Sequence, residues 1–297
     1  MKKVIFAEYG GPDVLQLVDA EEPHAGPGEV RIAVRATGVN AHDWRVREGQ
    51  FRDSHPIELP SGVGLDASGV VDEIGEGVTG VEIGDRVFGE GSQTYAEFAV
   101  LSAWVPIPEG LTFEETAGYA SIAESSLRVL RQVGVQPGQT LLVSGASGGV
   151  GSVVLPVARE RGIAVIGVAG PDSQDYVRSL GALATTYGPG WVERVRQLGK
   201  VDAALDVAGS GVVPELVELT GDPHKVISMA DLSAPEHGVR FSGTAGSVQD
   251  ALDEIVDLVA AGKLRIPVER TYPLADAATA QIDSQAGHTR GRRVIVI

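Results

Sequence analysis

A chain of 297 residues, 43% of them hydrophobic and 22% charged, is typical of a globular enzyme with two domains. Its formal net charge of −16 disfavours nucleic acid as a partner, because phosphate backbones repel an acidic protein. With no cysteine, the chain can form neither a disulfide nor a thiolate zinc site, so a redox function requires a bound cofactor. No apolar run is long enough to span a bilayer, and the start MKKVIFAEYGG lacks the apolar core of a signal peptide. We therefore expect a cytoplasmic protein with no membrane partner.

The first part of the chain, to about residue 115, predicts a mostly β unit. Glycine, proline and aspartate separate its short β runs, which are VRIAVRATGV, ASGVVDEIG, GDRVFG and YAEFAVLSAWVPI. From about 120 to 262, apolar strand-like runs alternate with helical stretches, which is typical of a parallel sheet built from βαβ units. The predicted helices cover 150–161, 173–180, 190–198, 212–220 and 247–261. The tail returns to a strand, a short helix and a strand, and we expect it to rejoin the first unit.

The segment TLLVSGASGGVGSVVLPVARERG, residues 140–162, predicts a dinucleotide-binding turn. An apolar strand ends at Ser144, a turn of small residues follows, and an apolar helix starts near Val150. Small residues let the backbone approach a pyrophosphate, whose charge is stabilised by the free amides and the positive end of the helix. The fingerprint is A-x-G-x-x-G, with alanine at the usual first glycine. The predicted cofactor-binding residues are Ala146, Ser147, Gly148, Gly149, Val150 and Gly151. Valine at either Gly148 or Gly151 should abolish cofactor binding and leave the fold largely intact.

The next apolar run, AVIGVAGPDSQDY, bears on the choice between NADPH and NADH. An NAD enzyme usually ends this strand with an acidic residue that binds the ribose hydroxyls and repels the 2′-phosphate of NADP. Here Ala169 and Gly170 end the strand, which favours NADPH. Asp172 follows in the loop and is a candidate substitute for that acidic residue.

Four segments together resemble the zinc-free quinone reductases of the medium-chain dehydrogenase/reductase superfamily. They are GVNAHDWRVREG, GLDASGVVDEIGEGVTGVEIGDRVFG, SGASGGVG and AGKLRIPVERTYPL…GHTRGRRVIVI, and they follow one another through essentially the whole chain. The resemblance implies an α/β protein with a GroES-like, mostly β domain over 1–118 and 264–297. It also implies a Rossmann domain with a doubly wound parallel sheet over 119–263, and a homodimer.

The resemblance further implies that no metal is bound. Zinc-dependent members carry a cysteine where this chain has Asn40 and a histidine where it has Leu65. Leucine cannot bind zinc and an amide is a poor zinc ligand, and the four-cysteine loop of a structural zinc site is absent. The six histidines are scattered without metal-ligand spacing, and we interpret them as surface or loop residues.

In the relatives, a tyrosine after the third Rossmann strand and two basic residues hold the adenosine phosphates. Tyr187 matches the tyrosine, and Arg292, with Arg290 beside it, matches the basic residue of the C-terminal block. A guanidinium suits bidentate phosphate contact, and the alternative is that both arginines are solvated charges of the tail. Gln174 stands where relatives have the second basic residue, and Arg178, one helical turn later, is a candidate substitute.

Three further residues border the nicotinamide half of the cofactor in this resemblance. Ser125 stands where relatives place a threonine, which suits a hydrogen bond to the nicotinamide phosphate. Val207 and Ala208 follow the fourth strand, at the carboxyl edge where open parallel sheets bind ligands. Asp206, within that strand, is interpreted as a structural carboxylate.

Without a metal, a thiol or a flavin motif, the chemistry expected of this chain is hydride transfer from NADPH to a quinone or an enone. Such acceptors spread the arriving negative charge onto an oxygen that a few hydrogen bonds stabilise. Asn40 is the candidate donor of such a bond, or else a loop amide bonded to the backbone. For Arg45, the two alternatives are that it orients the substrate or that water supplies the proton instead. Trp44 and Phe51 are expected either to line an apolar substrate pocket or to belong to the core.

Two other functions stay open. The first is an enoyl-thioester reductase that acts with a carrier protein, although the negative charge of this chain disfavours docking to an acidic carrier. The second is a non-catalytic NADPH-binding protein. The predicted cofactor turn does not separate these functions from a quinone or enone reductase, whereas turnover of such acceptors would.

Overall fold

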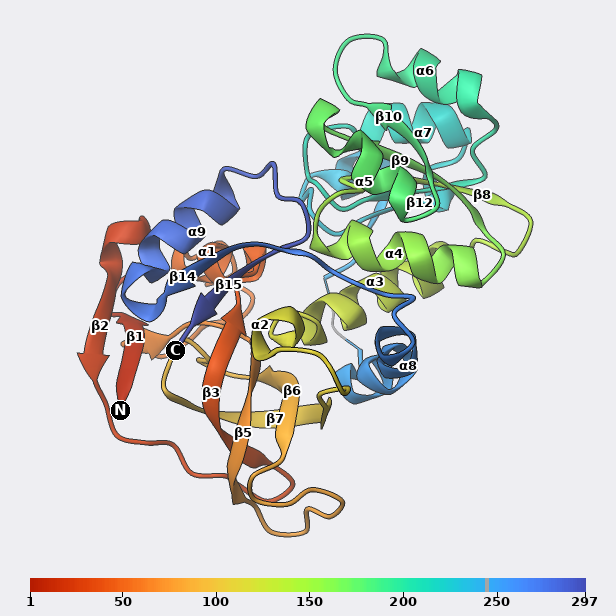
Figure 1. The fold of residues 1–297 in the computed structure, drawn as a ribbon. Coiled ribbons are helices and arrows are strands. Elements are labelled where there is room, and N and C mark those ends of the chain that lie inside the picture. Colours follow the sequence, from red (N-terminus) through yellow and green to blue (C-terminus); the bar gives the residue numbers. More distant parts are fainter. Residues whose placement is uncertain (244–245) are drawn as a thin grey trace. The chain divides into compact units, whose positions relative to one another are not determined.

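The computed structural model describes residues 1–243 and 246–297, and the chain divides into two compact units (Figure 1). Unit 1 comprises Met1–Ser121, Val248–Ala260 and Pro267–Ile297, and unit 2 comprises Ile122–Ser247 and Ala261–Ile266. Helix α8 (Val248–Ala260) belongs to unit 1, where Gln249 hydrogen-bonds both the amide and the carbonyl of Trp104. The predicted domain boundaries group residues 248–260 with the dinucleotide-binding domain instead, and these boundaries stay a prediction.

A six-stranded sheet forms the centre of unit 1. Its order is β14-β15-β3-β5-β6-β7, and β3 also pairs with β7, so β3, β5, β6 and β7 close on one another. The strands are β3 (Val30–Gly38), β5 (Asp66–Ile74), β6 (Arg86–Gly91), β7 (Phe98–Pro106), β14 (Val268–Pro273) and β15 (Arg292–Val296). The side chains of Val30, Ile32 and Val34 are buried in the core, and those between them are more exposed, as a strand with one buried face requires. Of the tail strands, blue in Figure 1, β15 lies beside β3 and β14 lies beside β15.

A smaller sheet and four helices accompany it. The order of this sheet is β2-β1-β4, with β1 (Lys2–Phe6), β2 (Leu15–Asp19) and β4 (Ser61–Gly62). The helices of unit 1 are α1 (Ala41–Arg47), α2 (Phe113–Thr116), α8 and α9 (Ala277–Gln285). At the start of α1, the Asp43 carboxylate accepts a hydrogen bond from the amide of Asn40 at 2.8 Å. This bond fixes Asn40 at the junction between β3 and α1.

Unit 2 is a parallel sheet flanked by helices. Its order is β10-β9-β8-β11-β12-β13, which is the 3-2-1-4-5-6 arrangement of dinucleotide-binding folds. The strands are β8 (Thr140–Ser144), β9 (Ala164–Ala169), β10 (Leu183–Thr186), β11 (Ala203–Asp206), β12 (Val226–Ser228) and β13 (Arg240–Phe241). Leu141, Leu142 and Val143 are fully buried, as a central parallel strand requires. The strand order reverses between β8 and β11, and ligands bind at the carboxyl edge of such a switch point.

The helices of unit 2 follow the predicted alternation with the strands. They are α3 (Ala120–Val133, which begins in unit 1), α4 (Gly149–Glu160), α5 (Gln174–Ser179), α6 (Trp191–Leu198) and α7 (Val213–Thr220). The predicted helices match α4 to α8 within one residue at each end, while α3 is missing from the prediction. Short 3-10 turns cover Pro12–Val14, Pro171–Ser173, Pro223–Lys225, Ala234–His237 and Leu274–Asp276. The α/β fold class is confirmed, and none of the helices in 1–243 and 246–297 is long and apolar enough to cross a membrane.

Candidate cofactor and active site

The predicted phosphate-binding turn joins β8 to α4 at the switch point. Gly145 has a φ of +87°, in the left-handed region that favours glycine. The amides of Gly145 and Ala146 both donate to the carbonyl of Val168 on β9, at 3.1 Å each. The amide of Gly148 donates to the carbonyl of Gly145 at 3.2 Å. These backbone bonds fix the turn to the sheet.

Gly148 and Gly151 serve different purposes in this turn. A Cβ on Gly148 would have one neighbour within 4 Å, the carbonyl oxygen of Gly145 at 3.6 Å, so the space beside it is open. A Cβ on Gly151 would lie 2.4 Å from the carbonyl oxygen of Ala146, because α4 packs directly on the turn. Gly148 therefore leaves room for a ligand, and Gly151 lets the helix approach. The methyl group of Ala146 is buried towards Gly167 and stays out of the open space. The partly exposed residues Ser147, Gly149 and Val150 complete the turn.

A chain of hydroxyl groups that the sequence did not reveal supports the start of α4. Ser152 Oγ donates to the carbonyl of Gly148 at 2.8 Å, and the phenolic hydroxyl of Tyr176 donates to Ser152 Oγ at 2.8 Å. Ser152 is one turn beyond Gly148, so its position in the helix was a usable sequence signal. Tyr176 comes from α5, and no local pattern predicts that contact.

The predicted residue Ser125 lies on α3, next to Ser126, whose side chain contacts α4. Ser126 Oγ donates to the carbonyl of Val150 at 3.3 Å, which ties α3 to the first turn of α4. Ser125 itself is partly exposed, and its Oγ accepts a hydrogen bond from Arg128 Nη2 at 3.4 Å. Both serines therefore lie near the start of α4.

The loop after β11 lies beside the phosphate turn. A Cβ on Gly145 would be 3.0 Å from the Cβ of Ala208 and 3.1 Å from a methyl group of Val207. The buried carboxylate of Asp206 shapes this loop, because its Oδ1 accepts from the amides of Ala208 at 3.2 Å and Gly209 at 3.0 Å. Burial raises the pKa of Asp206. The structure thus brings the turn and the predicted residues Val207 and Ala208 together, with Asp206 in a structural position.

The ends of β9 and β10 form a second cluster. Gln174 Nε2 lies 3.1 Å from the carbonyl oxygen of Ala169, 3.0 Å from that of Gly170 and 3.2 Å from that of Thr185. A Cβ on Gly170 would lie 3.5 Å from the hydroxyl oxygen of Tyr187, whose side chain is half exposed. The structure therefore brings Ala169, Gly170 and Tyr187 together, and the amide of Gln174 bonds strand carbonyls.

In unit 1, Asn40 is hydrogen-bonded to a buried carboxylate. Asn40 Nδ2 donates to Asp66 Oδ2 at 2.8 Å, and Ser121 donates to both oxygens, from its amide at 2.7 Å and its hydroxyl at 2.8 Å. Arg292 Nη2 lies 3.3 Å from the same Oδ2, so the carboxylate has a charged partner. Asp66 is fully buried and Asn40 is 8% exposed, so the direction of the Asn40 amide is fixed by this network.

A second buried carboxylate lies next to Asn40. Oδ2 of Asp43 accepts a hydrogen bond from the backbone amide of Asn40 at 2.8 Å and one from the Tyr95 hydroxyl at 2.9 Å. Its other oxygen, Oδ1, has no hydrogen-bond partner among the residues that the structure describes. Burial is the main cause that raises the pKa of Asp43 to about 7, and the neighbouring charge of Asp66 adds to it.

The predicted substrate residues belong to α1 and the turns that follow it. The guanidinium carbon of Arg45 lies 5.3 Å from the ring centroid of Trp44, a cation–π distance. Phe51 is stacked on the imidazole of His42, with ring centroids 5.5 Å apart. Trp44, Arg45 and Phe51 are all partly exposed, so these side chains are neither free on the surface nor part of the core.

The two predicted tail arginines differ in their surroundings. Arg292 is 4% exposed and is paired with Asp66 in unit 1, whereas Arg290 is exposed and its backbone amide donates to Glu269 at 3.1 Å. Tyr187, their predicted companion, belongs to unit 2. Phosphate contact by either arginine stays a prediction.

The residues at the zinc position of the superfamily do not suit a metal ion. Leu65 has no ligand atom, and the Asn40 amide donates to Asp66. Within 1–243 and 246–297, no group of three or more His, Cys, Asp or Glu side chains is arranged to hold a metal.

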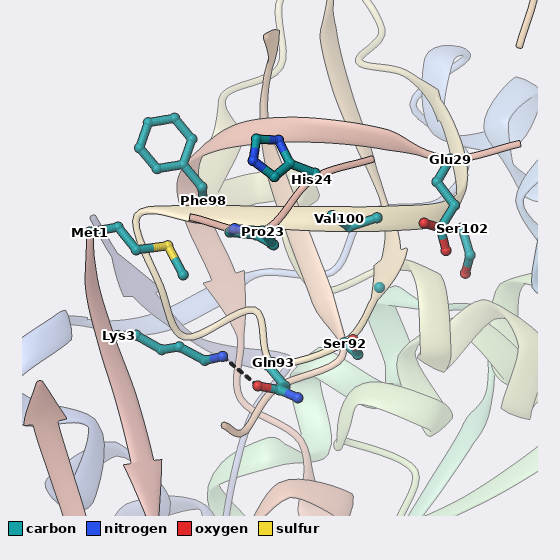
Figure 2. Close-up of a pocket in the computed structure, with 12 residues that line it drawn as sticks. Met1, Lys3, Pro23, His24, Glu29, Ser92, Gln93, Phe98, Val100 and Ser102 are labelled. Atoms are coloured by element: carbon teal, nitrogen blue, oxygen red, sulfur yellow. Dashed lines mark hydrogen bonds between the residues drawn. The ribbon is translucent and has the colours of Figure 1, made fainter. Parts of the chain in front are cut away.

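One further pocket, of about 410 Å³, contains none of the predicted site residues (Figure 2). It is lined by Met1, Lys3, Pro23, His24, Glu29, Gly91, Ser92, Gln93, Phe98, Ala99, Val100 and Ser102. Two of its polar side chains have partners nearby: Lys3 donates to Gln93, and Glu29 accepts from the backbone amide of Gly26. These contacts single out no ligand.

Comparison with known proteins covers both units. Residues 26–120 match the family model of the alcohol dehydrogenase GroES-like domain, and residues 180–295 match that of the zinc-binding dehydrogenases. A quinone oxidoreductase from Pseudomonas aeruginosa is 30% identical over 325 aligned positions, which cover 99% of each chain. The solved quinone oxidoreductase from Coxiella burnetii has a TM-score of 0.87 and 28% identity, with 100% of this chain and 99% of that one covered. A mycobacterial protein complexed with NADPH has a TM-score of 0.84 and 28% identity, with both chains fully covered.

Proposed function

Because the chain belongs to the medium-chain dehydrogenase/reductase superfamily, as an oxidoreductase similar to quinone oxidoreductases, we propose that it uses NADPH to reduce a quinone or an α,β-unsaturated carbonyl compound. The observation that carries this proposal is the open space at Gly148, at the edge where β8 and β11 part. A pyrophosphate fits such a space against the amides of a helix start. The NADPH complex of the mycobacterial relative supports the same cofactor here.

The cofactor site that we propose follows the carboxyl edge of the unit 2 sheet. Its residues are Ser125, Ala146, Ser147, Gly148, Gly149, Val150, Gly151, Ala169, Gly170, Tyr187, Val207 and Ala208. Arg290 and Arg292 of unit 1 remain candidates for phosphate contact. When bound, NADPH supplies the hydride that reduces the acceptor.

Asn40 is the proposed donor to the acceptor oxygen. Its Nδ2 carries two hydrogens, and the structure shows one bond from this nitrogen, to Asp66. The second hydrogen can be donated to the oxygen on which negative charge develops. Arg292 offsets the negative charge of Asp66. The carboxylate can therefore orient the Asn40 amide while repelling the negative charge on the acceptor oxygen less strongly.

The walls of the acceptor site come from α1 and the following turns in this proposal. Trp44 and Phe51 present flat apolar faces that suit a planar conjugated acceptor, and Arg45 orients a polar substituent of it. A small-molecule acceptor follows from the similarity to quinone oxidoreductases.

The test is the oxidation of NADPH by the purified protein with a panel of quinones, enones and acyl-thioester enoyl substrates. We expect turnover with quinones or simple enones and none with Gly148→Ala, which blocks the cofactor space. Binding of NADPH without turnover of any acceptor would identify a non-catalytic binding protein. Turnover confined to the thioesters would identify an enoyl-thioester reductase. Size-exclusion chromatography with light scattering tests the predicted homodimer on the same sample.

A further inference from the structure

Arg194, in the first turn of α6, lies against the end of β10. Its Nη1 donates to the carbonyl of Pro189 at 2.8 Å. Its Nη2 donates to the carbonyls of Thr186 at 2.9 Å and Tyr187 at 3.2 Å. The guanidinium is thereby held beside the segment that carries Tyr187, at the carboxyl edge of the unit 2 sheet.

The positive charge of Arg194 has no carboxylate partner among residues 1–243 and 246–297. Its bonds go to backbone carbonyls, and its Nε is buried without a hydrogen-bond partner. Arg178 on α5 differs, because Asp175 lies 2.7 Å from it and neutralises its charge. Nη1 of Arg194 has two hydrogens and one acceptor, so the group keeps a donor for a further ligand.

The neighbouring groups leave a 2′-phosphate without a cation at this edge. Gln174 is neutral, and its amide bonds the carbonyls of Ala169, Gly170 and Thr185. Asp172 is exposed in the loop after Gly170 and would repel a phosphate. A phosphate near Gly170 and Tyr187 therefore needs a positive charge from another residue.

We propose that Arg194 is the residue that binds the 2′-phosphate of NADPH and gives the protein its preference over NADH. Arg194 lies beside Tyr187, and Tyr187 lies beside Gly170, so the three form a continuous edge. The remaining hydrogen of Nη1 can form a charge-assisted hydrogen bond to a phosphate oxygen. This inference rests on the proposed function, and it assigns to Arg194 the positive charge that the resemblance expects of a basic residue at the Gln174 position.

The test uses two adenosine fragments, 2′,5′-ADP and 5′-AMP, which differ in the 2′-phosphate and need no acceptor or turnover. Isothermal titration calorimetry of wild type, Arg194→Gln and Arg194→Lys gives the affinities. We expect Arg194→Gln to weaken 2′,5′-ADP by about tenfold to hundredfold and to leave 5′-AMP unchanged. Arg194→Lys keeps the charge and should retain most of the preference, and it also serves if Arg194→Gln does not fold. Arg196→Gln is the matched control, because Arg196 lies on the same helix and is paired with Glu218, and it should change neither affinity.

The two affinities separate a phosphate contact from a structural role. If Arg194→Gln merely loosens the segment after β10, the affinities for both fragments fall by the same factor, and the proposal is wrong. It is also wrong if the preference of the wild type for 2′,5′-ADP survives in Arg194→Gln, or is lost in a folded Arg194→Lys. If the wild type binds neither fragment, the proposed nucleotide site fails and this inference fails with it.

Discussion

Asn40 and Asp66 are joined by a 2.8 Å hydrogen bond from Nδ2 to Oδ2, and both lie at the edge of the unit 1 core. They lie 26 positions apart in the sequence, Asn40 just after the end of β3 and Asp66 at the start of β5. In this chain the amide and the carboxylate bind one another. The bond gives the amide a single direction, which is a requirement for a donor to a developing oxyanion.

Replacing Asn40 with alanine should therefore remove transition-state stabilisation. We expect kcat to fall about a hundredfold with an enone while the affinity for NADPH changes little, because the proposed partner of the Asn40 side chain is the acceptor oxygen and not the cofactor. Steady-state kinetics and a fluorescence titration measure the two quantities. Ser121→Ala is the control, since it also removes a hydrogen bond to Asp66 and should keep most of the activity. An equal loss of kcat in both variants would mean that Asn40 has a purely structural role.

Alanine at Gly148 and at Gly151 should give opposite results. Gly148 has a φ of −75° and open space at its Cβ, so Gly148→Ala should fold normally and lose cofactor affinity. At Gly151 the new Cβ would meet the backbone of Ala146, so Gly151→Ala should lower the melting temperature. This differs from the expectation that Gly151 substitution spares the fold. Thermal unfolding with and without NADPH measures both effects; a Gly148→Ala variant with unchanged affinity would contradict the turn as the site.

Gln174→Lys should sharpen the preference for NADPH. A charge-assisted contact with the 2′-phosphate is worth about 1.5–3 kcal/mol, or one to two decades of affinity. The amide of Gln174 bonds carbonyls at the ends of β9 and β10, and the three ammonium hydrogens of lysine can retain some of these bonds. Gln174→Met is the control, because it removes the donors without adding charge. Titration with NADPH and NADH gives the ratio, and an unchanged ratio in Gln174→Lys would place the phosphate elsewhere.

The raised pKa of Asp43 predicts a pH-dependent stability. Its pKa is 3.8 in the unfolded chain and about 7 in the folded protein, so the folded protein holds an extra proton between these values. The stabilisation by this proton is complete below the lower value and is lost as the pH rises to the upper one. Asn cannot take up this proton, so Asp43→Asn should not lose stability in this way. As the pH rises through that range, the unfolding free energy of the variant minus that of wild type should increase by up to about 1.4 kcal/mol per pH unit. Urea unfolding at several pH values measures the slope. Asp53→Asn, at an exposed position, serves as the control variant.

Metal removal should leave the activity intact. Leu65 and the absence of cysteine deprive the superfamily's zinc position of ligands. The purified protein should contain less than a stoichiometric amount of zinc and keep its rate in a chelator. About one zinc per chain, with activity lost on its removal, would overturn the proposed metal-free mechanism.

Local sequence patterns predicted most of the helices of unit 2, whereas they did not predict contacts between residues far apart in the sequence. Helices α4 to α8 were predictable because apolar spacing and flanking turn residues act over a few positions. Helix α3 has the same apolar spacing, at Ala123, Leu127 and Leu130, and was predictable too. Arg292 is different, because its partner Asp66 is 226 positions away and no spacing links them. The contacts of Gln174 and Arg194 with strand carbonyls likewise depend on the folded chain.

Strand β15 occupies an interior place in the sheet of unit 1, between β14 and β3. A ribosome makes residues 292–296 after every strand of unit 2, whose last strand ends at residue 241. During synthesis, residues 36–38 of β3, which pair with β15, therefore stay unpaired on this side while the parallel sheet of unit 2 can already form. An unpaired edge of this kind attracts other strands. The unit that begins the chain is thus the unit whose sheet is completed last.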